Sequence, residues 1–156
     1  MELIRTCAVA TAAFALGTTA TLHQTKPGAL DPNSLKAMVE GLGYEVKAIN
    51  TEPGKEKFEI PAKTANFNVP VAAEISPSKN YIWLTVHLGA NSPTKKHEQL
   101  LKENANIQPS FFYITSKGAL MMAQPLDNRE VTAAIMKRCL EKIINDVDKT
   151  AASWKD

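Results

Sequence analysis

The sequence predicts a single α+β domain with an antiparallel sheet of five to six strands and flanking helices. The expected order is helix, four strands, helix, two strands, helix (α-β-β-β-β-α-β-β-α). Three observations support this prediction. Segments that alternate apolar and polar residues follow one another between segments with helical periodicity. Pro and Gly turns separate them. The length of 156 residues suits one domain and is too short for two domains of ordinary size.

Residues 31–43 carry the signals of the first helix. Asp31 is a suitable N-cap, Pro32 occupies the first helical position, and Gly43 is a C-terminal cap. The apolar residues of this segment recur on one face, namely Leu35, Met38, Val39 and Leu42. The helix is therefore expected to pack against another element.

Four strands are predicted next, at residues 44–49, 57–60, 69–75 and 81–88. Pro53 and Gly54 match the turn between the first two. The last strand has the strongest signal, with a core face of Ile82, Leu84, Val86 and Leu88 and a second face of Tyr81, Trp83, Thr85 and His87. The second face is aromatic and amphipathic, so it either contacts a partner or forms a partly solvated face of the sheet.

Residues 109–126 read as a hairpin whose turn, Ser116-Lys117-Gly118, contains the glycine that such connections favour. Both faces of this hairpin are apolar. One holds Phe112, Ile114, Leu120 and Met122, and the other holds Phe111, Tyr113, Ala119, Met121 and Ala123. A sheet with one buried face would show one polar face instead. We therefore expect a helix to cover one face and a partner, a ligand or a second copy to cover the other.

Two further helices flank the hairpin. The first is expected from Ser92-Pro93 to about Ala105, anchored by Leu100 and Leu101. The second is expected to begin with a capping box at residues 127–130. Its broad apolar face holds Val131, Ile135, Met136, Cys139, Leu140, Ile143, Ile144 and Val147, and should cover the sheet. Residues 149–156 are expected to fray, with Trp154 folded back.

Residues 1–20 have the layout of a secretory signal peptide, with an apolar run over 6–16 and a cut after Ala20. The alternatives are an apolar N-terminal helix or a membrane anchor, but the run is too short and too rich in Ala and Thr to span a bilayer well. The chain then divides into a disordered lead at 21–30, the domain at 31–150 and a tail at 151–156. The mature protein would be periplasmic or secreted, without stable membrane insertion.

No catalytic signature is found in the sequence, and no enzyme activity or cofactor is expected. Lys and Arg are scattered and the net charge is only +2, which argues against a nucleic-acid partner. His87 and His97 lack the matched ligand spacing of a metal site. Cys139 lies on the apolar face of the last helix, where core packing is favoured over a reactive thiol.

Several segments together resemble the YbjN-like group and the class I type III secretion chaperones. They are residues 100–107, Phe111–Ile114, Gly118–Leu120, Gln124–Asn128 and the final helix, within a similarity that covers about Leu35 to Val147. The motifs are loose and none is catalytic. The resemblance implies a chaperone-like helix–sheet–helix sandwich that binds an extended segment of a client protein and is usually a homodimer.

The leading hypothesis is therefore a non-enzymatic, exported domain that binds a protein or peptide client, or itself as a homodimer, through its sheet. The alternative is a small-molecule or lipid-binding domain that uses a pocket of Met and aromatic residues, since Met adapts to varied partners. The candidate residues of the partner or dimer surface are Phe111, Tyr113, Met121, Trp83 and Tyr81.

Overall fold

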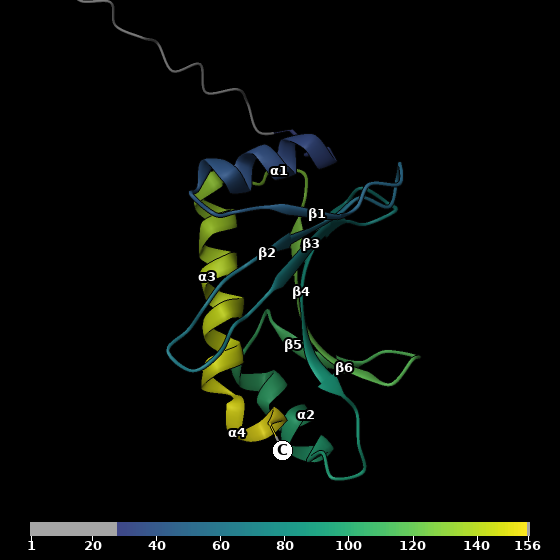
Figure 1. Ribbon diagram of the computed structural model, residues 1–156, viewed down its shortest axis with the longest axis vertical. Helices are drawn as coiled ribbons and strands as arrows, with labels where there is room; N and C mark the ends of the chain where they lie inside the picture. The colour runs from purple at the N-terminus through teal and green to yellow at the C-terminus, as the bar shows by residue number, and fades with distance from the viewer. Residues whose placement is uncertain (1–27, 156) are drawn as a thin grey trace, which may run out of the picture.

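A computed structural model describes residues 28–155 of the chain (Figure 1). The predicted signal peptide and residues 21–27 of the predicted lead lie outside the described residues. The described helices are α1 (Pro32–Gly41), α2 (His97–Asn106), α3 (Ala133–Lys149) and α4 (Ala151–Trp154). The strands are β1 (Lys47–Asn50), β2 (Lys57–Ile60), β3 (Val71–Ile75), β4 (Tyr81–Ala90), β5 (Phe111–Ile114) and β6 (Ala119–Asp127).

The strands form one antiparallel sheet in the order β1-β2-β3-β4-β6-β5. This confirms the predicted α+β class and the predicted order of elements up to α3. The strand order brings β6 between β4 and β5, so the hairpin of β5 and β6 pairs with the longest strand. That placement puts the outward side chains of β4, β6 and β5 on one continuous surface.

The helices and the inner face of the sheet enclose the core. α3 runs along the sheet, α1 lies at one end of α3, and α2 and α4 lie at the other end (Figure 1). Alternate residues of the central strands point into this layer, and the apolar faces of α1 and α3 meet them. Fully or almost fully buried residues of the core include Leu35, Val39, Ile60, Val71, Ile82, Leu84, Val86, Leu120, Met122, Met136, Leu140 and Ile143.

The predicted signals of the first helix and turn are confirmed. The side chain of Asp31 accepts a hydrogen bond from the backbone N–H of Ser34 at 2.7 Å. Gly43 follows the end of α1 with a φ of 88°, a conformation that glycine adopts without steric cost. Gly54 has a φ of 81° in the turn between β1 and β2.

The second helix begins at His97, four residues after Pro93, the predicted first helical position. Residues 92–95 instead form a separate turn, in which the N–H of Lys95 donates to the carbonyl of Ser92 at 3.1 Å. The hydroxyls of Ser92 and Thr94 lie 2.6 Å apart, so the Ser92 side chain bonds within that turn. Leu100 is buried as predicted, but Leu101 is 70% exposed and is not an anchor.

The capping box predicted at residues 127–130 is also wrong. Asp127 ends β6, and the N-cap of α3 is Thr132, whose hydroxyl accepts from the N–H of Ile135 at 3.2 Å. Asn128 is fully buried and bonds to residues far away in sequence. It accepts from the N–H of Leu30 at 3.0 Å, and it donates to the carbonyls of Leu30 at 3.0 Å and Lys79 at 2.9 Å.

The predicted frayed tail forms α4 instead, although the predicted return of Trp154 is correct. The indole N–H of Trp154 donates to the carbonyl of Val147 at 2.8 Å, and its ring centre lies 5.2 Å from that of Phe67. Lys95 Nζ donates to the carbonyl of Trp154 at 2.7 Å. These contacts hold α4 against α3, Phe67 and the turn that precedes α2.

Strand boundaries differ by a few residues from the prediction. β1 starts at Lys47 rather than at residue 44, and β3 starts at Val71 rather than at residue 69. Pro70 has no N–H to donate to a strand ladder, which explains the later start of β3. Val69 is nevertheless fully buried, and its N–H donates to the carbonyl of Ala62 at 2.7 Å.

Candidate partner-binding surface

Aromatic side chains gather on the outer face of β4 and β5. The ring centres of Trp83 and Phe111 lie 6.3 Å apart in an edge-to-face arrangement, and those of Phe111 and Tyr113 lie 5.9 Å apart. Such pairs are favourable beyond their buried area. Met121 is the cross-strand partner of Tyr113. Tyr81 lies on the same face as Trp83, two residues earlier on β4, and is 47% exposed.

The aromatic side chains enclose a hollow of about 380 Å³, which we call the aromatic hollow and which is lined by Glu74, Trp83, Thr85, Phe111, Tyr113 and Ala123. Its floor is low because small residues flank Thr85 on both neighbouring strands. Ala72 of β3 and Ala123 of β6 are the register partners of Thr85. Trp83, Phe111 and Tyr113 are larger and stand around this floor.

One carboxylate and one hydroxyl give the aromatic hollow its polar character. Glu74 is the register partner of Trp83, and its Oε2 lies 3.2 Å from Nζ of Lys57. Thr85 is 5% exposed, and its hydroxyl is buried without a hydrogen-bond partner within residues 28–155. A buried polar group without a partner costs about 1–3 kcal/mol. Thr85, which lines the aromatic hollow, therefore carries an unused hydrogen-bonding group.

Burial raises the pKa of the Tyr113 phenol, and the negative charge of Glu74 raises it further. Both causes favour the neutral phenol. The Tyr113 hydroxyl therefore keeps its proton at neutral pH and remains a hydrogen-bond donor. The acidic character of the aromatic hollow comes from Glu74.

A second apolar depression of about 180 Å³ lies beside the aromatic hollow, between α2 and β5. We call it the edge groove, and it is lined by His97, Leu100, Leu101, Phe112, Tyr113, Ile114 and Leu120. Leu101 and Ile114 are 70% and 44% exposed, which is high for large apolar side chains. Tyr113 lines both depressions, so the two form a continuous surface around β5.

The free edge of β5 is covered by a side chain. Asn104 Oδ1 accepts from the N–H of Phe112 at 2.7 Å, and Asn104 Nδ2 lies 3.3 Å from the carbonyl of Phe112. The amide of Asn104 thus takes the place that a neighbouring strand would occupy at this residue. A partner at this edge therefore meets side chains more than free backbone.

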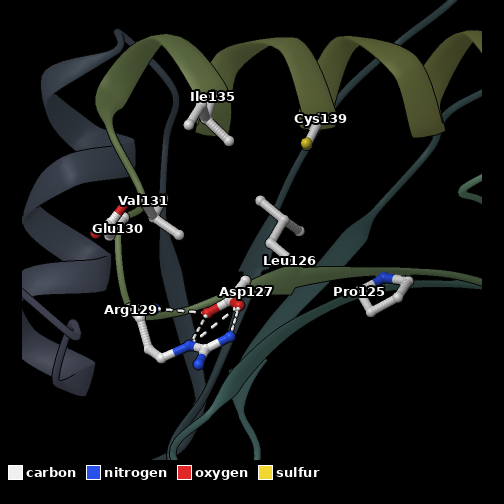
Figure 2. A pocket seen from close by; sticks show the side chains of 8 residues that line it. All are labelled: Pro125, Leu126, Asp127, Arg129, Glu130, Val131, Ile135 and Cys139. Atoms are coloured by element: carbon white, nitrogen blue, oxygen red, sulfur yellow. Dashed lines mark hydrogen bonds and ion pairs between the residues drawn. The ribbon is translucent and has the colours of Figure 1, made fainter.

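A cleft of about 530 Å³ lies between α3 and the end of β6 (Figure 2). Leu126, Val131 and Ile135 line it, and Asp127 and Arg129 pair with each other at one side. Arg129 holds the pKa of Asp127 at about 2 through hydrogen bonds. Burial raises the pKa of the half-buried Cys139 thiol, which also lines the cleft. The cleft is larger than the aromatic hollow. Its Asp127 and Arg129 side chains pair with each other, however, and its Cys139 thiol stays protonated.

The methionines do not form the pocket expected for small-molecule or lipid binding. Met122 and Met136 are fully buried in the core, and Met38 packs against the core. Of the methionines in residues 28–155, only Met121 lies on the outer face with the aromatic side chains. The predicted set of residues is therefore divided between the two faces of the sheet.

A buried polar cluster lies where the start of β5 meets α3. Ser110 donates to Asp146 Oδ2 at 2.7 Å or to Gln124 Oε1 at 2.9 Å, and Lys142 donates to the carbonyl of Ile107 at 2.7 Å. Ser110 is 1% exposed, so a substrate cannot reach its hydroxyl. The cluster fixes residues 107–110 to α3. It has the character of a structural network rather than a nucleophilic site.

The described part of the chain contains no group of three or more His, Cys, Asp or Glu residues that could hold a metal ion. His87 is exposed, and Nε2 of His97 lies 2.6 Å from Asn91 Oδ1. None of the helices in residues 28–155 is long and apolar enough to cross a membrane.

Some residues of this surface were not among the sequence candidates, notably Glu74, Leu101 and Ile114. Glu74 alternates with the buried Ala73 on β3, so its outward direction could be read from the sequence. Its position beside Trp83 depends on the register between β3 and β4. Leu101 follows the buried Leu100 on α2, and which of the two residues faces the core depends on how α2 packs against the sheet.

The sequence matches no protein-family model and no curated protein. The structure is similar to a chain in the solved structure of the heterodimeric complex ExoU–SpcU, from the type III secretion system of Pseudomonas aeruginosa. The TM-score is 0.57 and the sequence identity is 12%, and the match covers 78% of this chain and 98% of the chain in that complex. It is also similar to the HopA1–SchA chaperone–effector complex, with a TM-score of 0.52 and 10% identity over 78% of this chain and 91% of that chain. The fold is therefore the predicted chaperone-like sandwich. The YbjN-like resemblance stays a prediction.

Proposed function

We propose that this domain is a non-enzymatic module that binds a segment of a partner protein on the outer face of its sheet. One observation carries the proposal. The helices α1 and α3 pack against the inner face, whereas the aromatic cluster of β4 and β5 lies half-exposed on the outer face. Contiguous exposed apolar side chains with a polar rim are typical of interaction sites.

The composition of this surface favours a protein partner. Tyr and Trp are enriched at protein interfaces, where they bury a large area at low entropic cost. Trp83, Phe111 and Tyr113 would form the centre of such an interface, and Met121 would adapt to the partner's shape. The similarity of the fold to a chain of a chaperone–effector complex supports the same proposal.

Two further parts of the proposal concern assembly and location. The outer face could also pair with a second copy of the chain, which would give a homodimer. We propose in addition that the protein acts in the periplasm or outside the cell, because residues 1–20 have the pattern of a signal peptide. Sequencing the N-terminus of the purified native protein tests export: a start at Thr21 supports it, and an intact Met1 contradicts it.

The test of function is capture of partners from an extract of the source cells by immobilised wild-type protein and by Met121→Asp. Ile49→Asp is the matched control, because Ile49 is 53% exposed on β1, at the other edge of the sheet. A captured protein is then purified, and its Kd is measured by calorimetry. We expect Met121→Asp to weaken binding by about tenfold or more, since it buries a charge in the interface. Equal Kd values for wild type and both variants would contradict the proposed surface.

A further inference from the structure

The aromatic hollow has the composition of a cation site. Three aromatic rings and a carboxylate line it, and so does Thr85, whose buried hydroxyl has no partner within residues 28–155. A cation is attracted to the negative face of an aromatic ring, and the attraction strengthens when water is excluded. We infer that the aromatic hollow binds an arginine side chain of the partner protein. This inference rests on the proposed function and names the group that the partner contributes.

Hydrogen-bonding capacity favours a donor-rich ligand. Lys57 Nζ lies 3.2 Å from Oε2 of Glu74, which leaves Oε1 for a second donor. Thr85 Oγ1 can accept a hydrogen bond after rotation of its side chain, because it has no partner within residues 28–155. A guanidinium carries five N–H donors in one plane and accepts none. It therefore has donors enough for both oxygens and a flat face that can stack on a ring.

The other classes of side chain fit less well. An anion would find no donor on the Glu74 carboxylate, which accepts hydrogen bonds and donates none, and Lys57 already pairs with that carboxylate. An apolar side chain would leave the buried Thr85 hydroxyl without a partner. Lysine matches the charge, but its ammonium is more strongly hydrated than a guanidinium and cannot stack on Trp83 or Phe111. Lysine is the weaker ligand for these reasons.

The two tryptophans of the chain allow a direct measurement. Trp83 lies in the aromatic hollow, and Trp154 is buried in α4. The full chain is labelled with ¹⁵N and titrated with Ac-Ala-Arg-Ala-NH₂, with the corresponding citrulline peptide and with the lysine peptide. Citrulline keeps the shape of arginine and removes its charge. We expect the arginine peptide to shift the Trp83 indole signal saturably and to leave Trp154 in place, with the lysine peptide weaker and the citrulline peptide weakest.

Variants separate the contributions of charge and hydroxyl. Glu74→Gln should weaken the arginine peptide by about fivefold or more. Glu45→Gln is the control, because Glu45 also pairs with a lysine, Lys47 at 3.5 Å, and the net charge changes equally. Thr85→Val should also weaken the peptide without lowering the melting temperature, since it removes an unpartnered hydroxyl and keeps the side-chain shape.

Equal affinities for the arginine and citrulline peptides, or an affinity unchanged by Glu74→Gln, would overturn the inference. An unchanged Trp83 signal in all three titrations would do the same. These results leave the proposed function standing if Met121→Asp still weakens the captured partner and Ile49→Asp does not. Failure of the proposed function appears instead as a partner whose Kd is insensitive to Met121→Asp.

Discussion

The two faces of β4 are built from alternate residues of one strand, yet they have different surroundings. Ile82, Leu84 and Val86 are at most 2% exposed on the inner face. Tyr81 and His87 are exposed on the outer face, and Trp83 is half-buried among other aromatic side chains. The inner apolar residues therefore stabilise the fold, whereas the outer ones stay partly exposed at the surface of the sheet.

Truncation on the inner face should have the largest effect on stability. Leu84→Ala removes a fully buried side chain, and we expect it to lower the free energy of unfolding by about 2–5 kcal/mol. Met121→Ala on the outer face should cost less than about 1 kcal/mol, because Met121 is only half-buried. Denaturation in urea measures both. Similar losses for the two variants would mean that the outer face is core in solution.

The buried polar cluster should give the next largest effect. Asp146→Asn removes the charge that pairs with Lys142 and accepts from Ser110, so we expect a loss of about 1–3 kcal/mol in the free energy of unfolding. Glu141→Gln, on the exposed side of the same helix, serves as the control and should change stability by less than about 0.5 kcal/mol. If the two variants lose equal stability, the buried polar cluster does not stabilise the fold as a structural network.

Thr85→Val should leave the free energy of unfolding unchanged or raise it by up to about 1 kcal/mol. The reason is that the Thr85 hydroxyl is buried and lacks a partner in the described part of the chain. Thr115→Val is a suitable contrast, because the Thr115 hydroxyl accepts from the N–H of Ala119 at 3.0 Å. Thermal unfolding should show a loss for Thr115→Val only. A comparable loss for Thr85→Val would show that its hydroxyl is satisfied in solution.

Acid should weaken the fold slightly through two exposed carboxylates. Hydrogen bonds to Ser34 lower the pKa of Asp31, and hydrogen bonds to Arg129 lower that of Asp127 to about 2. Because the unfolded state binds these protons more readily, their contribution is present above about pH 4 and is lost as the pH falls towards 2. The double variant Asp31→Asn and Asp127→Asn should unfold with a shallower pH dependence in this window. If the stability of the double variant depends on pH as steeply as that of the wild type, these two carboxylates do not cause the pH dependence.

The sequence predicted the faces of the sheet because the alternation of side chains along a strand has a fixed period of two. Alternation predicts that Trp83, Phe111, Tyr113 and Met121 each lie on the second face of their own segment, and the register of β4, β6 and β5 brings these faces together. Helix starts were less predictable because they depend on competing hydrogen bonds. Asn128 bonds to Leu30, 98 residues away, and no local pattern reports such a contact.

The composition of the aromatic hollow could be predicted only in part. Glu74 and Thr85 point outward by alternation, but their neighbours are set by the strand order, in which β6 lies between β4 and β5. The small Ala72 and Ala123 flank Thr85 only in this register. The depth of the aromatic hollow is therefore a tertiary property.

Photo-crosslinking in the native cells tests the central claim most directly. Benzoylphenylalanine replaces Tyr113 in one strain and Ile49 in another, and adducts are identified by mass spectrometry. We predict an adduct with a partner protein from position 113 and none from position 49. An adduct with the mass of two copies of the chain would identify self-association through this face. Adducts from position 49 alone would contradict the account.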